Sequence, residues 1–287
     1  MKRLIGLVLG SVMAAGASAE PILEWSVDQY STFTAWTDLN EASNPTNPVT
    51  ADFYTTAPAS PDGDTSKDLD GYDELYWGLP RGTEPSSLFV GTTDTTDLGC
   101  DPSGPCGAYT DAQVFTNGDA VETLTYNHAN NVISGSVTES GVLKEGTITG
   151  RIDLTAVNPP AGYLGSDQAF YDIEFYESDN TAAQCEYPGS PNCPDVVGLA
   201  SDDFVFDANT GTATFQEVVN FGPFGSYLII VALEDLVEID DAARCPAGTS
   251  PCFGLITNEG LTNTFITTLQ ILAAPIPAPA VPALMGL

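Results

Sequence analysis

The sequence predicts an all-β protein: an antiparallel, jelly-roll-like β-sandwich with three short loops closed by disulfides. Three observations carry this prediction. Apolar and polar residues alternate in several short segments, as in strands with one buried face. Turn-forming Gly, Pro, Asn and Asp residues separate these segments, and the six cysteines fall into three close pairs. Beyond the first 19 residues no long stretch has helical periodicity.

Alternation is clearest in the second half of the chain. Within one segment, Tyr171, Ile173 and Phe175 share a face, and acidic residues occupy the other. Because successive side chains of a strand point to opposite faces, such a segment fits a sheet with one buried side. Strands of this kind are expected at Thr147–Leu154, Phe170–Tyr176 and Phe265–Ile271.

Other strands are expected from turn signals and continuous apolar runs. Asp207–Gly211 is rich in turn formers and predicts a hairpin between Phe204–Phe206 and Thr212–Phe215. The apolar run Tyr227–Leu233 predicts a central strand buried on both faces. Val121–Tyr126 and Val132–Val137 are expected to pair, whereas Leu233–Ile239 is ambiguous and could be one short helix.

The chain divides into a leader, a folded part and a tail. Lys2 and Arg3 precede an apolar run that ends before an A-x-A motif at residues 17–19, the pattern of a signal peptide in residues 1–19. That run is shorter than the ~20 residues that span a bilayer. Residues 20–272 are expected to form the β-sandwich, as one domain or two smaller ones. Asn40–Asp64 should be a surface loop, and residues 273–287 an extended Pro/Ala-rich tail.

The charge is strongly negative and restricts the partners. With 39 acidic and 7 basic side chains, the formal net charge is −32. Nucleic acid is excluded as a partner because phosphate neutralisation needs clustered Lys and Arg. Anionic lipid surfaces are disfavoured for the same reason. The hydrophobic content of 43% is ample for a packed core, so the acidity does not indicate disorder.

The cysteines support an oxidising compartment. Each close pair encloses a short segment rich in Pro, Gly and Ser, and pairing within each segment has the lowest closure entropy. Such a loop constrains the unfolded chain by roughly 2–2.5 kcal/mol. Zinc is the competing interpretation, but the spacings miss the usual C-x₂₋₄-C pattern. The expected disulfides are Cys100–Cys106, Cys185–Cys193 and Cys245–Cys252.

Little in the sequence favours an enzyme, and we expect none. His128 is the only histidine, so any Ser-His-Asp or Cys-His mechanism would have to use it. The simpler interpretation is a strand-end or loop histidine that hydrogen-bonds nearby backbone. A glycosidase needs only two carboxylates, but a pair cannot be singled out among 39 acidic residues. No cofactor is expected, apart from calcium.

The calcium hypothesis concerns one acidic segment. Alternating aspartates around a glycine could supply several of the six to eight oxygen ligands that calcium takes. The EF-hand spacing is not met, because Trp77 stands where the bidentate Glu belongs. An acidic, solvated loop is the alternative. The candidate ligands are Asp62, Asp64, Asp68, Asp70 and Asp73.

Two aromatic residues follow that segment. Tyr76 and Trp77 could form a platform for a sugar ring beside bound calcium. The commoner alternative is that these rings belong to the core, since a buried Trp contributes a large apolar surface.

Several short motifs follow one another in a set order along the chain. They are Leu75–Gly78, Ser86–Leu88, Asn127–Ser134, Phe175–Asn180 with the following cysteines and Asp195, and Cys245–Cys252 with Thr257–Glu259. Their order resembles that of the THxN family of PEP-CTERM proteins. Within Asn127–Ser134, His128 and Asn130 match the signature that names the family, and Asn127 replaces its usual Thr. The tail has Pro275–Pro279 where a Pro-Glu-Pro sorting signal would stand.

The resemblance implies an exported surface protein of a Gram-negative bacterium, recognised by an exosortase and associated with exopolysaccharide or biofilm matrix. It implies no enzymatic activity and no binding residue. Two alternatives stand beside it: a calcium-dependent carbohydrate-binding module, and a structural subunit that self-associates through edge strands.

The calcium hypothesis gives the first prediction. If the acidic segment binds calcium, millimolar calcium should raise the melting temperature of the purified protein relative to chelator, because a ligand that binds only the folded state stabilises it. Magnesium at equal ionic strength is the control for general charge screening. An unchanged melting temperature would rule the site out.

Overall fold

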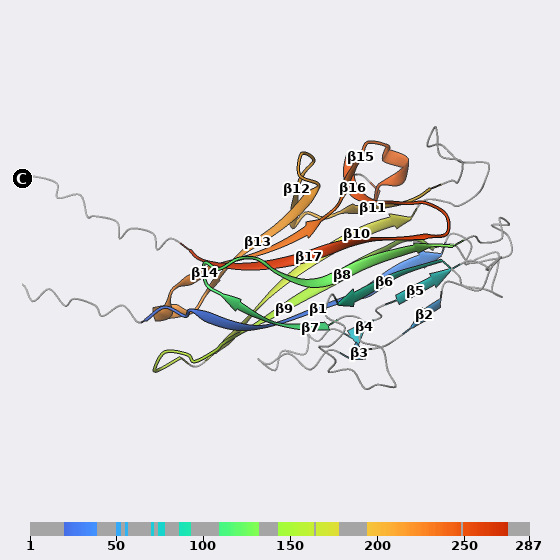
Figure 1. Ribbon diagram of the computed structural model, residues 1–287. Helices are drawn as coiled ribbons and strands as arrows, with labels where there is room; N and C mark the ends of the chain where they lie inside the picture. The colour runs from blue at the N-terminus through green and yellow to red at the C-terminus, as the bar shows by residue number, and fades with distance from the viewer. Residues whose placement is uncertain are drawn as a thin grey trace, which may run out of the picture.

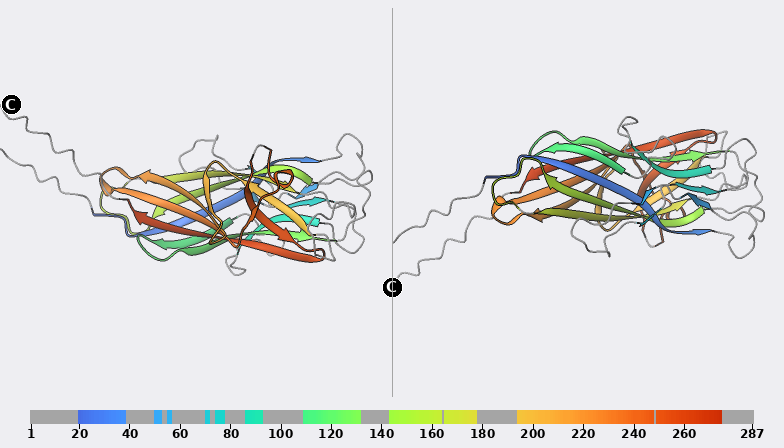
Figure 2. Two further views of the ribbon diagram at one scale, coloured as in Figure 1. Left: turned by 90° about the horizontal axis from the view of Figure 1, so that it is seen from above. Right: turned by 90° about the horizontal axis from the view of Figure 1, so that it is seen from below.

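Two antiparallel sheets packed face to face form the body of the molecule, which confirms the predicted all-β sandwich (Figures 1 and 2). The computed structural model describes residues 20–38, 50–52, 55–56, 70–71, 74–77, 86–92, 109–131, 143–163, 165–177, 194–247 and 249–274. In these ranges the only helices are two single 3-10 turns, η2 (Gly222–Phe224) and η3 (Ala242–Arg244).

The first sheet, sheet A, has seven strands. Its centre is the long β1–β9–β10 ladder, in which β9 pairs with β1 on one side and β10 on the other. In spatial order the strands are β15 (Val237–Ile239), β16 (Cys252–Thr257), β11 (Asp195–Ala200), β10 (Ser166–Glu177), β9 (Leu143–Ala156), β1 (Glu24–Asp38) and β7 (Tyr109–Phe115).

The second sheet, sheet B, has eight strands and includes β17, which runs between β14 and β8. A separate two-stranded ladder joins β3 (Thr55–Thr56) and β4 (Asp70–Gly71). The order in sheet B is β12 (Phe204–Asp207), β13 (Thr212–Asn220), β14 (Ser226–Glu234), β17 (Leu261–Ala273), β8 (Val121–Asn130), β6 (Ser86–Thr92), β5 (Glu74–Trp77) and β2 (Thr50–Asp52).

The alternation read from the sequence sets which side chains fill the space between the sheets. In β10 the residues Tyr171, Ile173 and Phe175 are buried, as predicted. β17 alternates in the same way, and the Asp207–Gly211 connection forms the expected hairpin between β12 and β13. In β9 the alternation holds only in part, because Arg151 and Asp153 on its second face are also buried, where they form an ion pair at 3.0 Å.

Most of the buried hydrophobic residues form one cluster between the sheets, with members from Ile22 to Ile271. A second, small cluster consists of Val196, Ile239, Cys245 and Cys252.

Several expectations need correction. β14 is a central strand, but only one of its faces is fully buried, because the outer face of an antiparallel sandwich sheet meets solvent. Leu233–Ile239 contains no helix: Asp235 adopts φ 64° and reverses the chain between β14 and β15. Asn40–Asp64 contains the short strands β2 and β3. β8 pairs with β6 and β17, and residues 132–137 lie outside the described ranges.

One end of the sandwich holds a cluster of aromatic rings and both ends of the described chain. Trp25 packs against Phe221 and Tyr227, each with ring centroids 4.9 Å away. The Tyr227 hydroxyl accepts a hydrogen bond from the Ile22 amide at 2.7 Å, and Tyr227 is paired with Ala273. We call this the proximal end, and it lies at the left of Figure 1.

A polar group of side chains links the sheets in the middle of the core. The hydroxyl of Tyr126, from β8 in sheet B, donates to Ser31 Oγ of β1 at 2.7 Å and lies 3.3 Å from the Tyr171 hydroxyl of β10. Gln29 Nε2 donates to that Tyr171 hydroxyl at 2.9 Å. Burial raises the pKa of both tyrosines, so they remain neutral hydrogen-bonding groups.

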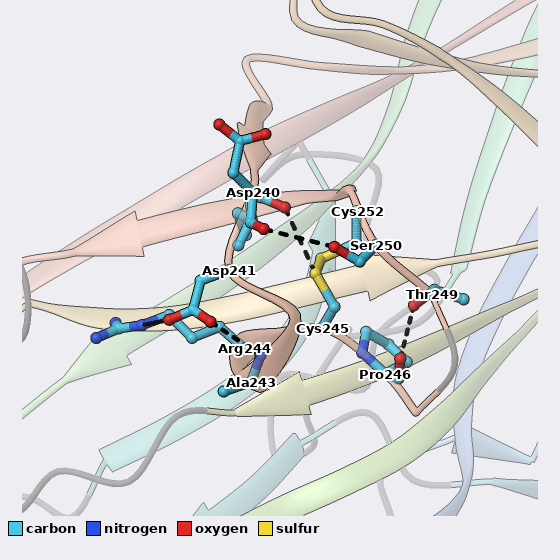
Figure 3. Close-up of a disulfide and its surroundings, with 10 residues drawn as sticks. Asp240, Asp241, Ala243, Arg244, Cys245, Pro246, Thr249, Ser250 and Cys252 are labelled. Atoms are coloured by element: carbon cyan, nitrogen blue, oxygen red, sulfur yellow. Dashed lines mark hydrogen bonds and ion pairs between the residues drawn. A yellow bond between two sulfur atoms is a disulfide. The ribbon is translucent and has the colours of Figure 1, made fainter.

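A disulfide-closed loop covers the outer face of sheet A beside β11 and β16. Cys245 and Cys252 are bonded as predicted, with their Cα atoms 5.8 Å apart (Figure 3). The loop begins after η3, where the Asp241 carboxylate accepts from the Ala243 amide at 3.0 Å. Gly198 of β11 allows this close approach, because a Cβ there would overlap the Arg244 carbonyl oxygen.

The contact at Gly198 gives a prediction about stability. Gly198→Ala should lower the free energy of unfolding by about 1–3 kcal/mol, since overpacking forces backbone of η3 off the sheet. Urea denaturation measures the loss. Gly165→Ala is the matched control, because a Cβ at Gly165 meets no atom within 4 Å. Equal midpoints for the two variants would contradict the close packing of η3 on β11.

Candidate functional site

Most of the predicted calcium ligands cannot be placed. Asp62, Asp64, Asp68 and Asp73 lie outside the described residues, and for Asp70 only the backbone of β4 is described. Cys100, Cys106, Cys185 and Cys193 also lie outside these ranges. The described residues therefore do not test the calcium hypothesis, which stays a prediction.

The aromatic pair lies on β5, and its tryptophan faces the core. Trp77 is 2% exposed, and its ring stacks on the His128 imidazole with centroids 5.9 Å apart and an interplanar angle of 11°. Tyr76 is half-buried. A ring enclosed in this way has no open face for a sugar, so Trp77 fills the role of a core residue.

His128 occupies the inner face of β8, toward the end opposite the aromatic cluster. Every second residue from Leu124 is buried between the sheets, and the series becomes more polar through Tyr126, His128 and Asn130. We call this the distal end, and it lies at the right of Figure 1. The backbone alternation of one strand therefore places an imidazole and a carboxamide in the core, both 0% exposed.

Three strands of sheet A place polar side chains opposite His128. Glu177 is the last residue of β10, Asp195 the first of β11 and Thr257 the last of β16. Asp195 is paired with Thr257, and Glu177 with Val197, two residues beyond Asp195. Residues paired across strands, or two apart on one strand, share a face. All three side chains therefore point inward.

Thr257 joins the signature residues of β8 to sheet A. The Nδ1 atom of His128 lies 2.9 Å from Thr257 Oγ1, and Asn130 Nδ2 donates to the Thr257 carbonyl oxygen at 2.9 Å. One atom each from His128, Glu177 and Asp195 lie within 4.8 Å of one another. We call these three residues the His128 cluster.

The side chains of the His128 cluster are shielded from solvent, and this determines their electrostatics. The exposed fractions are 0% for His128 and 2% for both Glu177 and Asp195. Burial lowers the pKa of His128 to about 3, so its imidazole is neutral around pH 7. The Nε2 atom is buried and has no hydrogen-bond partner among the described residues. Either Nδ1 or Thr257 Oγ1 can donate in their contact, and in the tautomer that has the ring proton on Nδ1, Nε2 carries a lone pair. The cluster offers one nitrogen and two carboxylates, a donor set that can bind a metal ion.

Sequence reasoning singled out His128 and Asn130 as signature residues, but it gave Glu177 and Asp195 only as parts of similar segments and assigned them no contact with His128. A signal for Glu177 was present, because it continues the inward-facing series of Tyr171, Ile173 and Phe175. Asp195 and Thr257 start and end short strands that give no comparable alternation. The structure also brings together most of the motifs on which the family resemblance rests. Five of their residues lie close together at the distal end: Trp77, His128, Glu177, Asp195 and Thr257.

A second feature is an acidic groove of about 510 Å³ where β10 and β11 meet β12. Its aromatic lining comes from Phe204, Phe206 and Phe253. The Asp172 carboxylate accepts from Thr149 at 2.7 Å, and the Asp203 carboxylate accepts from the Asp172 amide at 3.1 Å. These exposed acids support the local fold and form no convergent set.

No protein-family model matches the chain, and no curated protein is significantly similar to it. Within the described ranges, no helix has the length and apolar character needed to cross a bilayer.

The contact between His128 and Thr257 gives a third prediction. Thr257→Val should lower the free energy of unfolding by about 1–3 kcal/mol, because it leaves a buried imidazole nitrogen without its hydrogen-bond partner. Thr262→Val on β17 is the matched control, since Thr262 is exposed. Guanidinium denaturation compares the two. A loss no larger than that of the control would mean that the hydroxyl does not hold the imidazole.

Proposed function

We propose that this chain is an exported protein that acts without catalysis at the cell surface or in the extracellular matrix of a Gram-negative bacterium. The observation that carries the proposal is the position of His128. A histidine-based mechanism needs the imidazole within hydrogen-bond reach of a substrate. His128 is 0% exposed, stacked on Trp77 and held by Thr257, so a substrate has no access to it.

Export is supported by two independent features. Residues 1–19 have the charged, apolar and small-residue regions of a signal peptide in the correct order. Cys245 and Cys252 are joined in a disulfide, and structural disulfides persist in oxidising compartments outside the cytosol. With a net charge of −32, the protein would stay soluble there and would contact anionic polysaccharide through bridging divalent cations.

The resemblance to THxN PEP-CTERM proteins supports a place at the surface or in the matrix. Its motifs lie far apart in the sequence, yet five of their residues converge at the distal end of the sandwich. Such convergence is expected if the motifs preserve one structural unit. On this proposal the tail is a sorting signal of the exosortase type, and the partner is exopolysaccharide.

Fractionation of a Gram-negative host tests the proposal. The full chain should appear in the surface or extracellular fraction, with Cys245 and Cys252 protected from thiol reagents until reduction. A chain lacking residues 2–19 is the matched control, and it should remain in the cytosol with reactive thiols. The exported protein should also sediment with exopolysaccharide purified from a biofilm. Retention of the full chain in the cytosol would refute the proposal.

A further inference from the structure

We propose that the His128 cluster binds one divalent transition-metal ion of the zinc class, held by His128 Nε2 and by one carboxylate oxygen each from Glu177 and Asp195. The ion would join sheet B to sheet A at the distal end. This inference concerns the folded part of the chain and is independent of where the protein is located.

The donor set selects the class of ion. Zinc-class ions accept imidazole nitrogen together with carboxylate oxygen, whereas calcium takes six to eight oxygen ligands. Metal–ligand bonds of roughly 2.0–2.2 Å place neighbouring ligand atoms about 3.4 Å apart in a tetrahedral site. One ligand atom from each of the three residues already lies within 4.8 Å of the other two, so small side-chain rotations would complete the site.

An observation independent of the acidic pair points to a ligand. His128 Nε2 is fully buried and has no hydrogen-bond partner among the described residues, and a ring nitrogen of His128 lies within 4.8 Å of carboxylate oxygens of Glu177 and Asp195. A buried polar atom without a hydrogen-bond partner costs free energy, and nearly all buried polar atoms in native proteins have one. Asn130 Oδ1 is in the same condition and could supply a further oxygen, since its own Nδ2 is fixed on Thr257.

The protein also provides the orienting contact that metal-bound histidines usually have. Such a histidine donates its other ring nitrogen to a fixed acceptor, which selects the tautomer and aims the lone pair. Thr257 Oγ1 is placed for this role at 2.9 Å from Nδ1. The formal charge of two carboxylates matches that of a divalent cation, as required at a site shielded from water.

The position of the site indicates a structural role for the ion. Its three protein ligands are at most 2% exposed, which leaves no open path for a substrate. Glu177 and Asp195 also begin and end the sequence segment that contains Cys185 and Cys193. A metal bound to both would tie the end of β10 and the start of β11 to β8.

Metal content and affinity provide the test. The exported, purified full-length protein is stripped with chelator and titrated with zinc by equilibrium dialysis, counting bound ions per chain. We expect one tight site, and we expect Glu177→Gln and Asp195→Asn each to weaken it by at least tenfold. Glu174→Gln is the matched control, because Glu174 lies on the same strand but on its exposed face. It should bind like the wild type.

Two further readouts locate the ion. Cobalt should quench the fluorescence of Trp77, which stacks on His128, and zinc should reverse this quenching. Zinc at 100 times its Kd should raise the melting temperature by about 5–10 °C, a shift that Glu177→Gln should abolish. Near-UV circular dichroism of the metal-free variants shows that they are folded.

Two outcomes would overturn the proposal: no stoichiometric zinc in the wild type, or binding that is unchanged in both the Glu177→Gln and Asp195→Asn variants. The second outcome would assign the zinc to surface carboxylates. Neither outcome bears on export, which the fractionation experiment tests separately.

Discussion

The space between the two sheets imposes the constraint on which the rest of the molecule depends. Sandwich sheets stack about 10 Å apart, and a polar group inside that gap costs free energy unless it finds a partner there. Tyr126 meets this requirement at the centre, where its hydroxyl bonds to Ser31 and contacts Tyr171 across the gap. Because side chains of a strand alternate between its two faces, Leu124 and His128 on either side of Tyr126 also face the core. Of these two residues, His128 lies nearer the distal end. The register of β8 therefore determines which of its side chains sheet B contributes to the His128 cluster.

The fold was predictable to the extent that it depends on local pattern. Alternation and turn residues found β9, β10, β17 and the β12–β13 hairpin, because each is specified by neighbouring residues. The errors came where the outcome depends on distant partners. An apolar run such as Tyr227–Leu233 does not reveal that one of its faces meets solvent. Nor does the sequence show that β8 pairs with β6 and β17, which lie far from each other in the chain.

The candidate site was predictable only in part for a related reason. His128 drew attention because it is the only histidine, but its surroundings depend on which strands of sheet A face it. Those strands are brought opposite β8 by sheet order, which no local pattern encodes. Glu177 could have been predicted to face the core, because it continues the alternation of inward-facing residues in β10. A carboxylate after three buried apolar residues, however, also fits a strand that ends in a polar turn. Only the packed structure distinguishes these cases.

The arrangement of the two ends has a mechanical consequence. Ile22 and Ala273 lie together at the proximal end, and β17 runs from there to Leu261 at the distal end, between β8 and β14 (Figures 1 and 2). A force between the two proximal residues would open the hydrogen-bond ladders one bond at a time. A force between Ala273 and the distal end would instead pull β17 lengthwise against both neighbours, so that all its ladder bonds share the load. The sandwich is therefore built to withstand shear along its long axis better than peeling at its proximal end.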